Sequence, residues 1–461
     1  MKFIGRKKEL KDILKRFNSN RFEALFVYGR RRVGKSELIK EAIKRSGIRA
    51  ITYVCRESVF QSNLEGLSYA ITSAFGEDYL SFTALEPLLS YVFQKSSNEK
   101  IILFIDEYPF LRSGQGGAVD SEFQIAIDRF QNSSMLKLII CGSYIDMMKQ
   151  IIEADRPLYG RFTYQLHLKP FDYYEAAAFF PDCTHEEQFE YYACFGGIPS
   201  FLKEISTEDG LAGNIQTLLI PSGSALENEV QLQLKSELGK VESLNTLLEA
   251  IGTGCHSYKD LNARYSGESH SGALYPLNKL VEMELVEKTA PVNAPDNRKL
   301  ISYYISDNML DFFYSFLYRR ISERSIMNPE TFYKQFVEEK LRTDFLPRKF
   351  EKAAKEYLIR KNRAGGIDPP LTAIGRYVYH DKKSGENGEF DVCARSGAEW
   401  ICYECKYRSK KLDLSLIHHE KAQIGELGLK FDQFGFFSKK GFEEDVYEDR
   451  DILISLDQMY E

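Results

Sequence analysis

Apolar runs of strand length alternate with helix-like segments along the first 165 residues. The apolar runs are rich in Ile, Leu, Val and Phe and cover residues 24–28, 50–54, 100–105 and 135–141. Segments with apolar residues at helical spacing cover residues 7–16, 37–45, 61–75, 85–94 and 121–131. This alternation predicts an α/β fold in which helices cover both faces of a parallel sheet.

The pattern changes after residue 165 and predicts four further parts. Helices at 171–180 and 186–194 lead to the helix break Gly196-Gly197-Ile198-Pro199, which predicts a helical lid over residues 166–238. Three helices and two strands around a polar tip predict a winged helix over residues 239–306. The aromatic-rich stretch 307–321 predicts a buried helix and begins a helical connector, 307–339. Residues 340–461 read as a second α/β domain.

The predicted winged helix has little positive charge where such a unit would touch DNA. Its third helix offers Lys279 against Glu282 and Glu284, and its wing offers Arg298 and Lys299. Two interpretations therefore remain open at equal weight. Either this unit reads DNA, or it packs against protein and couples the first domain to the C-terminal part of the chain.

Composition and charge fit a large globular chain. The 461 residues carry a net charge of −6, so a nucleic-acid surface would have to be a local patch. No apolar run approaches the ~18 residues of a membrane span, and the amino terminus lacks a signal-peptide core. Eight scattered cysteines predict reduced thiols in a cytoplasmic protein.

A phosphate-binding motif follows the first apolar run. The motif G-x-x-x-x-G-K-[ST] is formed by Gly29, Arg30, Arg31, Arg32, Val33, Gly34, Lys35 and Ser36, and Glu37 starts the next helix. A strand, a glycine-containing loop and a helix in this order direct backbone N–H groups at a phosphate. Lys35 is expected to reach the β- and γ-phosphates of ATP, and Ser36 to ligate Mg²⁺.

Polar residues end two later strands. Asp106 and Glu107 close the run 100–105, and we expect Asp106 to hold Mg²⁺ and Glu107 to polarise the attacking water. Ser143 ends the run 135–141 and is placed to sense the γ-phosphate. Arg161, in Arg156-Pro157-Leu158-Tyr159-Gly160-Arg161, either reaches the γ-phosphate, in cis or from a neighbour, or forms a surface salt bridge.

These motifs occur in an order that resembles the archaeal-type ATPase family, a branch of the AAA+/STAND P-loop ATPases. The resemblance rests on FIGRKKEL, VYGRRRVGKSELI, LFIDEYP, the Gly-Ser tip, RPLYGR and FGGIP, and it covers about residues 1–220. It implies that ATP is bound, that Ser143 and Arg161 report the γ-phosphate, and that Pro199 contacts the adenine side. Such ATPases often work as nucleotide switches, so the resemblance does not imply fast ATP turnover.

The last domain carries a second chemical pattern, D-x₁₂-E-x-K. Asp391 and Glu404 lie on two expected strands of one hairpin, and Lys406 shares a face with Glu404. Two carboxylates can hold Mg²⁺ or Mn²⁺, and a lysine can orient water or stabilise charge. The alternative without a metal site is a hairpin with an exposed Glu404–Lys406 salt bridge. A third possibility is a domain that keeps the nuclease fold but has lost the nuclease activity.

This pattern resembles the PD-(D/E)xK nucleases, a restriction-endonuclease-like fold, and in particular their Holliday-junction-resolvase-like branch. The resemblance implies that Glu351 is the acid on the first helix, although Phe390 replaces the usual proline. That helix is rich in cations, which suits a phosphodiester substrate but would also suit a solvated face.

The leading hypothesis is an ATPase whose nucleotide state controls a metal-dependent DNA-binding or DNA-cleaving domain. Branched or single-stranded DNA is the favoured partner, no membrane is expected, and self-association into a homo-oligomer is left open. The alternative is a non-nucleolytic ATP switch whose last domain only binds nucleic acid or a protein.

Overall fold

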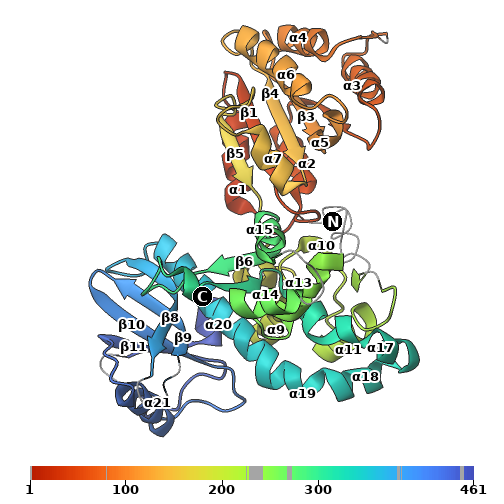
Figure 1. The fold of residues 1–461 in the computed structure, drawn as a ribbon. Helices are drawn as coiled ribbons and strands as arrows, with labels where there is room; N and C mark the ends of the chain where they lie inside the picture. Colours follow the sequence, from red (N-terminus) through yellow and green to blue (C-terminus); the bar gives the residue numbers. More distant parts are fainter. Residues whose placement is uncertain are drawn as a thin grey trace. The chain divides into compact units, whose positions relative to one another are not determined.

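The chain forms two compact units. The computed structural model describes residues 3–78, 80–224, 226–227, 242–266, 272–381, 385, 387–446 and 451–461. The first unit comprises Met1–Pro170 with Ile198–Ser200, and the second comprises Phe171–Gly197 with Phe201–Glu461. Figure 1 shows the elements of each unit. Among the described residues, no helix is both long and apolar enough to cross a bilayer.

The first unit is a parallel sheet between helices, which confirms the predicted α/β fold. Its strand order is β2-β3-β4-β1-β5, and every described pairing is parallel. The strands are β1 (Glu23–Tyr28), β2 (Arg49–Val54), β3 (Ile101–Asp106), β4 (Lys137–Gly142) and β5 (Tyr164–His167). The strand β5 was not predicted, because its residues are only partly buried and form no apolar run.

Side chains that alternate along the strands build a core on each face of this sheet. Leu25 and Val27 pack with α1 (Lys7–Phe17) and α2 (Lys35–Ser46). Ala24 and Phe26 pack in the cluster on the other face. The helices on that face are α3 (Phe60–Ala74), α4 (Leu85–Lys95), α5 (Tyr108–Leu111), α6 (Gly117–Phe130) and α7 (Ile145–Ile151).

The second unit begins with helices and continues through a three-helix and hairpin segment. The first helices are α8 (Tyr173–Ala177), α9 (His185–Phe195) and α11 (Gly210–Leu218), and the short α10 (Pro199–Leu202) spans the boundary between the units. The segment that follows contains α13 (Glu242–Gly252), α14 (Tyr258–Ser266), α15 (Leu274–Glu282) and the antiparallel strands β6 (Val286–Thr289) and β7 (Ser302–Ile305). This element order agrees with the expected one, and the winged-helix identity stays a prediction.

The aromatic stretch after β7 is buried, as predicted. Phe312, Phe313, Tyr314 and Phe316 are at most 5% exposed. They lie on α16 (Asn308–Phe312) and the π-helix Phe313–Leu317. The connecting helices are α17 (Ile321–Ile326), α18 (Pro329–Phe336) and α19 (Glu338–Lys340). Because these rings form a core, they offer no platform on which bases could stack.

The last sheet is mixed and lies between two helices. Its order is β12-β11-β10-β9-β8, with antiparallel pairs among β8, β9 and β10 and parallel pairs among β10, β11 and β12. The ring of Tyr403 contacts that of Phe437, which in turn contacts Tyr357 of α20, whereas Cys402 packs with Ile424 of α21. Successive strand residues point to opposite faces, so the two helices cover opposite faces. The elements are α20 (Leu346–Arg363), β8 (Leu371–His380), β9 (Asn387–Ser396), β10 (Glu399–Lys406), α21 (Leu414–Glu426), β11 (Gln433–Ser438), β12 (Ile452–Ser455) and α22 (Leu456–Met459).

Candidate functional site

The glycine loop joins the end of β1 to the first residue of α2. Gly29 and Gly34 have φ of 154° and 92°, a backbone region that favours glycine. A Cβ on Gly29 would lie 2.2 Å from the carbonyl oxygen of Leu168, so no side chain fits there. The loop therefore has the tight turn that a phosphate cradle needs, and α2 points its amino end into it.

Lys35 lies inside this loop. Its Nζ donates hydrogen bonds to the carbonyl oxygens of Gly29 and Arg30, at 2.8 and 2.9 Å, and to Ser143 Oγ at 2.9 Å. The residue is 5% exposed, and burial lowers the pKa of its ammonium from the usual value. A ligand phosphate would offer this buried cation a charged partner in place of neutral oxygens.

The end of β3 and the first turn of α2 bring two oxygen ligands together beside the loop. Ser36 Oγ donates to Asp106 Oδ2 at 2.6 Å, so the hydroxyl and carboxylate predicted to hold Mg²⁺ converge on one spot. A hard cation such as Mg²⁺ takes oxygen ligands of these kinds, and the pair fits it.

Glu107 is held by the polar residue at the tip of β4. Ser143 donates from Oγ to Glu107 Oε1 at 2.6 Å and from its backbone N–H to Oε2 at 3.3 Å. Glu107 has a φ of 51°, in the left-handed region that residues other than glycine rarely adopt. The same serine thus contacts both Lys35 and Glu107, a link that the separate sequence motifs did not reveal.

We expect Glu107→Gln to keep ATP bound and to slow its hydrolysis. The amide keeps the shape and leaves Asp106 in place, but removes the charge that would polarise water. Loss of a general base costs about 10²–10⁴-fold in rate. Single-turnover hydrolysis measures the effect, with the exposed Glu153→Gln as the matched control. An unchanged rate would reduce Glu107 to a turn residue.

The other predicted nucleotide residues fall into several groups. Arg30 and Val33 are buried under the loop, whereas Arg31, Arg32 and Glu37 are exposed. Pro199 lies beside the loop, because a Cβ on Gly34 would be 3.8 Å from its Cγ. The sequence did not single out Arg6, whose Nη2 donates to the carbonyl oxygens of Val33 and Lys169 at 3.4 and 2.5 Å.

The structure does not bring Arg161 to the glycine loop. Its guanidinium pairs with Asp128 through Nε–Oδ1 and Nη2–Oδ2 contacts of 3.0 and 2.7 Å. Thr163, two residues later, donates its backbone N–H to Ala24 at the amino end of β1, whereas the loop follows the carboxyl end. The surface ion pair is thus the alternative that this structure shows. A role for Arg161 at a neighbouring molecule's nucleotide stays a prediction.

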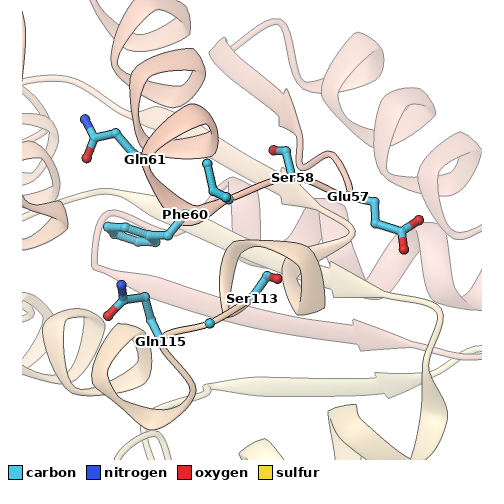
Figure 2. A pocket seen from close by; sticks show the side chains of 8 residues that line it. Glu57, Ser58, Phe60, Gln61, Ser113 and Gln115 are labelled. Atoms are coloured by element: carbon cyan, nitrogen blue, oxygen red, sulfur yellow. The ribbon is translucent and has the colours of Figure 1, made fainter.

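A hollow of about 620 Å³ opens at the same edge of the sheet, beyond the ends of β2 and β3. Figure 2 shows residues 57–61 on one wall and residues 113–115 on the other. None of the predicted ATP residues lines it, so it is separate from the glycine loop.

The hairpin β9–β10 carries Asp391 and Glu404 on neighbouring strands. The last pairs of its ladder are Cys402↔Cys393 and Tyr403↔Val392, so both acids come directly after the described pairing. The pairing of β9 with β8 is irregular between Cys393 and Phe390, where Asp391 lies. Burial is the largest cause that raises the pKa of each carboxyl. The charge of Asp391 also helps to raise the pKa of Glu404, so the two carboxyls lie within electrostatic reach. The pair therefore offers carboxylate oxygens of the type that binds Mg²⁺ or Mn²⁺.

Lys406 bridges Glu404 and a residue that the sequence did not reveal. Its Nζ lies 2.8 Å from Glu404 Oε1 and 2.8 Å from Glu420 Oε1 on α21. Gln423, one turn further along α21, contacts His419 at 3.1 Å between Nε2 atoms. The sequence alone does not single out Glu420, because one acidic residue on a surface helix resembles many others.

Glu351 on α20 senses the same acids. Burial, followed by the charge of Asp391, raises its pKa to about 8, whereas Lys355 acts in the opposite direction. However, no group of three His, Cys, Asp or Glu side chains within the described ranges is placed to hold a metal ion. The described structure thus places Glu351 within electrostatic reach of Asp391 and Glu404, but the three acids do not form a preassembled metal site.

Most cations of α20 serve the fold. Lys349 Nζ makes a buried ion pair with Asp311 at 2.6 Å, and Lys352 Nζ donates to the carbonyl oxygen of Ser306 at 2.7 Å. The guanidinium of Arg360 lies 3.3 Å from the ring centre of Tyr174. These residues cannot form the open basic face that the sequence suggested, and only part of the helix charge remains for a phosphodiester.

Comparisons with known proteins match both halves of the chain. A family model described as an ATPase domain predominantly from Archaea matches residues 3–205, and one described as Archaea bacterial proteins of unknown function matches residues 313–424. An uncharacterized protein of Methanocaldococcus jannaschii is 30% identical over 464 residues, covering 98% of each chain. An uncharacterized ATP-binding protein of that archaeon is 38% identical over 53 residues, 12% of this chain and 90% of that one. The solved structure of a Walker-type ATPase of Pyrococcus abyssi is 20% identical, with a TM-score of 0.48, over 68% of this chain and 96% of that one.

Proposed function

Because this chain belongs to the family of P-loop ATPases found predominantly in Archaea, we propose that its nucleotide state controls a metal-dependent DNA-binding or DNA-cleaving domain. The proposal rests on one observation. In the sheet that follows the ATPase, Asp391 on β9 lies within electrostatic reach of Glu404 on β10, and Glu404 pairs with Lys406 on the same strand.

The ATP site is proposed to use the residues around the glycine loop. Gly29–Ser36 would cradle the phosphates, Lys35 would neutralise them, and Asp106 would hold Mg²⁺ with Ser36. Glu107 would orient water, and Ser143, which already contacts both Lys35 and Glu107, would register the γ-phosphate. Pro199, beside Gly34, would contact the adenine side.

The second site is proposed to act on a phosphodiester. Asp391 and Glu404 would supply carboxylate oxygens to Mg²⁺ or Mn²⁺, and a bound metal would stabilise charge on the phosphate. Lys406 would orient water or stabilise developing charge, for which it would leave one of its two carboxylate partners. Glu351, whose raised pKa keeps it partly protonated near neutral pH, would be the third acid of the group.

Cleavage across several substrates tests this proposal. The 461-residue chain is incubated with junctions, flaps, single strands, duplex DNA and RNA, with Mg²⁺ or Mn²⁺, and with or without ATP. Metal-dependent cleavage that changes with ATP is expected, strongest on branched or single-stranded DNA. No cleavage of any substrate by a protein with active ATPase sites would favour the alternative.

The alternative is a non-nucleolytic switch whose last domain only binds nucleic acid or a protein partner. Two observations favour it. Lys406 is engaged by both Glu404 and Glu420, and the described residues contain no cluster of three metal-binding side chains. In this case the domain keeps the fold without the chemistry, and ATP would alter binding alone.

The five predicted parts keep their proposed roles. The core is 1–165, the lid 166–238, the winged helix 239–306, the connector 307–339 and the nuclease-like domain 340–461. One contact supports the packing role of the winged-helix segment. Val292 donates its backbone N–H to the carbonyl oxygen of Arg376 in β8 at 2.8 Å, whereas Arg298 and Lys299 of the wing are exposed.

A further inference from the structure

Helix α9 packs behind two of the residues proposed to act in the C-terminal site. The ring of Phe189 lies 5.2 Å from that of Tyr407 and 5.7 Å from that of Phe350, and the latter two rings are 5.5 Å apart. Tyr407 directly follows Lys406, and Phe350 directly precedes Glu351. One side chain of α9 therefore contacts the neighbours of both.

A partly buried polar contact reinforces this packing. Tyr407 donates its hydroxyl hydrogen to Glu190 Oε1 at 2.9 Å, and burial raises the pKa of both groups. Separating this pair would leave a partly buried carboxyl and a partly buried hydroxyl without each other, which costs more than losing a fully exposed contact. The position of Glu190 is thus linked to the position of Tyr407.

The adjoining strand is tied to the same helix. Lys439 Nζ lies 2.8 Å from Glu186 Oε1, and Lys440 Nζ lies 2.5 Å from Glu186 Oε2. The backbone N–H of Lys439 donates to the carbonyl oxygen of Lys406 at 3.1 Å. Helix α9 therefore holds the end of β10 from two sides, through Tyr407 and through Lys439.

The chain leaves α9 through a fixed turn and then enters the ATPase unit. Gly197 accepts a backbone hydrogen bond from Phe171, and a Cβ on it would lie 1.8 Å from the carbonyl oxygen of Phe171. The next residues, Ile198–Ser200, belong to the first unit, where Pro199 adjoins Gly34 of the glycine loop. Residues at the loop and residues behind the second site are thus consecutive in the chain.

We propose that α9 sets the position of Lys406 and Glu351 through Phe189 and Glu190, and that it passes the nucleotide state from Pro199 to the C-terminal site. Glu190 and Tyr407 are positioning residues in this scheme, since neither would touch the substrate. Only the cleavage measurement depends on the proposed function. Movement of the end of β10 can be measured whether or not the domain is a nuclease.

Three variants of the 461-residue chain test the contact. Tyr407→Phe keeps the ring and removes the hydroxyl, Glu190→Ala removes the acceptor, and Glu190→Gln keeps an acceptor. Hydrogen exchange of β10 and α20 is compared with and without a non-hydrolysable ATP analogue, together with cleavage. The nucleotide-dependent change should fall roughly three- to tenfold in the Phe and Ala variants, the range for one lost hydrogen bond, and Gln should restore it.

The outcomes separate the two hypotheses. ATPase activity should stay at the parent level, and the exposed Glu208→Gln is the matched control for the loss of a carboxylate. If the parent cleaves nothing but its β10 exchange responds to nucleotide and the variants lose that response, the proposed function fails and the coupling stands. If folded variants respond to nucleotide as the parent does, or the parent itself shows no response, the coupling is wrong.

Discussion

Lys35→Ala is expected to abolish ATP turnover and to weaken ATP binding severely. Lys35 is the buried cation inside the glycine loop, where it donates to two loop carbonyl groups and to Ser143. Removing one preorganised donor from a transition state costs about 10²–10³-fold in rate, and losing a full charge beside phosphates costs at least as much. Calorimetry with ATP and steady-state hydrolysis measure the two effects.

The control for this variant lies on the same helix. Lys40→Ala removes an exposed lysine of α2 whose contact with Glu37 is a surface ion pair of 3.6 Å. Such pairs contribute little, so binding and hydrolysis should match those of the parent. Unchanged ATP affinity and rate in a folded Lys35→Ala protein would contradict the assignment of the loop.

Asp391→Ala and Glu404→Ala are expected to abolish metal-dependent cleavage. Each removes one of the two proposed carboxylate ligands, and a single remaining carboxylate binds a divalent ion poorly. Lys406→Ala should also lose cleavage but retain most of the metal affinity, since lysine is not a ligand. DNA binding should survive in all three and strengthen when an acid is removed, because repulsion from phosphate falls.

Mn²⁺ titration, a DNA-binding assay and cleavage together distinguish these effects. Glu399→Ala, an exposed acid at the start of β10, is the matched control and should behave as the parent does. ATP hydrolysis should be unaffected by every change in the C-terminal sheet. Cleavage that persists in Asp391→Ala and Glu404→Ala would place the chemistry elsewhere in the chain.

Sequence-based prediction of the site was most successful where the functional residues are close together in the sequence. The glycine loop, the Asp106 strand and the Ser143 tip each have a local signature, and the structure places them together because parallel strands end at one edge. Strand spacing also predicted that Asp391 and Glu404 lie on the two strands of one hairpin, as they do on β9 and β10. The ATPase resemblance is confirmed at the level of the family, and the nuclease resemblance stays a prediction.

Contacts between distant segments could not be predicted. Glu420 reaches Lys406 from another element, and the partner of Arg161 is an aspartate 33 residues earlier in the chain. The cations of α20 illustrate the reason. A lysine that pairs with a buried carboxylate and one that faces water have the same local sequence pattern, and only the fold decides between them.

The tip of the β6–β7 hairpin has a consequence for self-association. Asn293 donates from Nδ2 to the carbonyl oxygen of Val378 at 2.7 Å, and its Oδ1 accepts from the backbone N–H of Val378 at 3.1 Å, so one amide side chain imitates a neighbouring strand. An open strand edge invites edge-to-edge aggregation between copies, and natural proteins cover such edges. Here β8 is capped from within the same chain at this point. Any homo-oligomer must therefore form through side-chain surfaces or another edge, and not by strand addition at Val378.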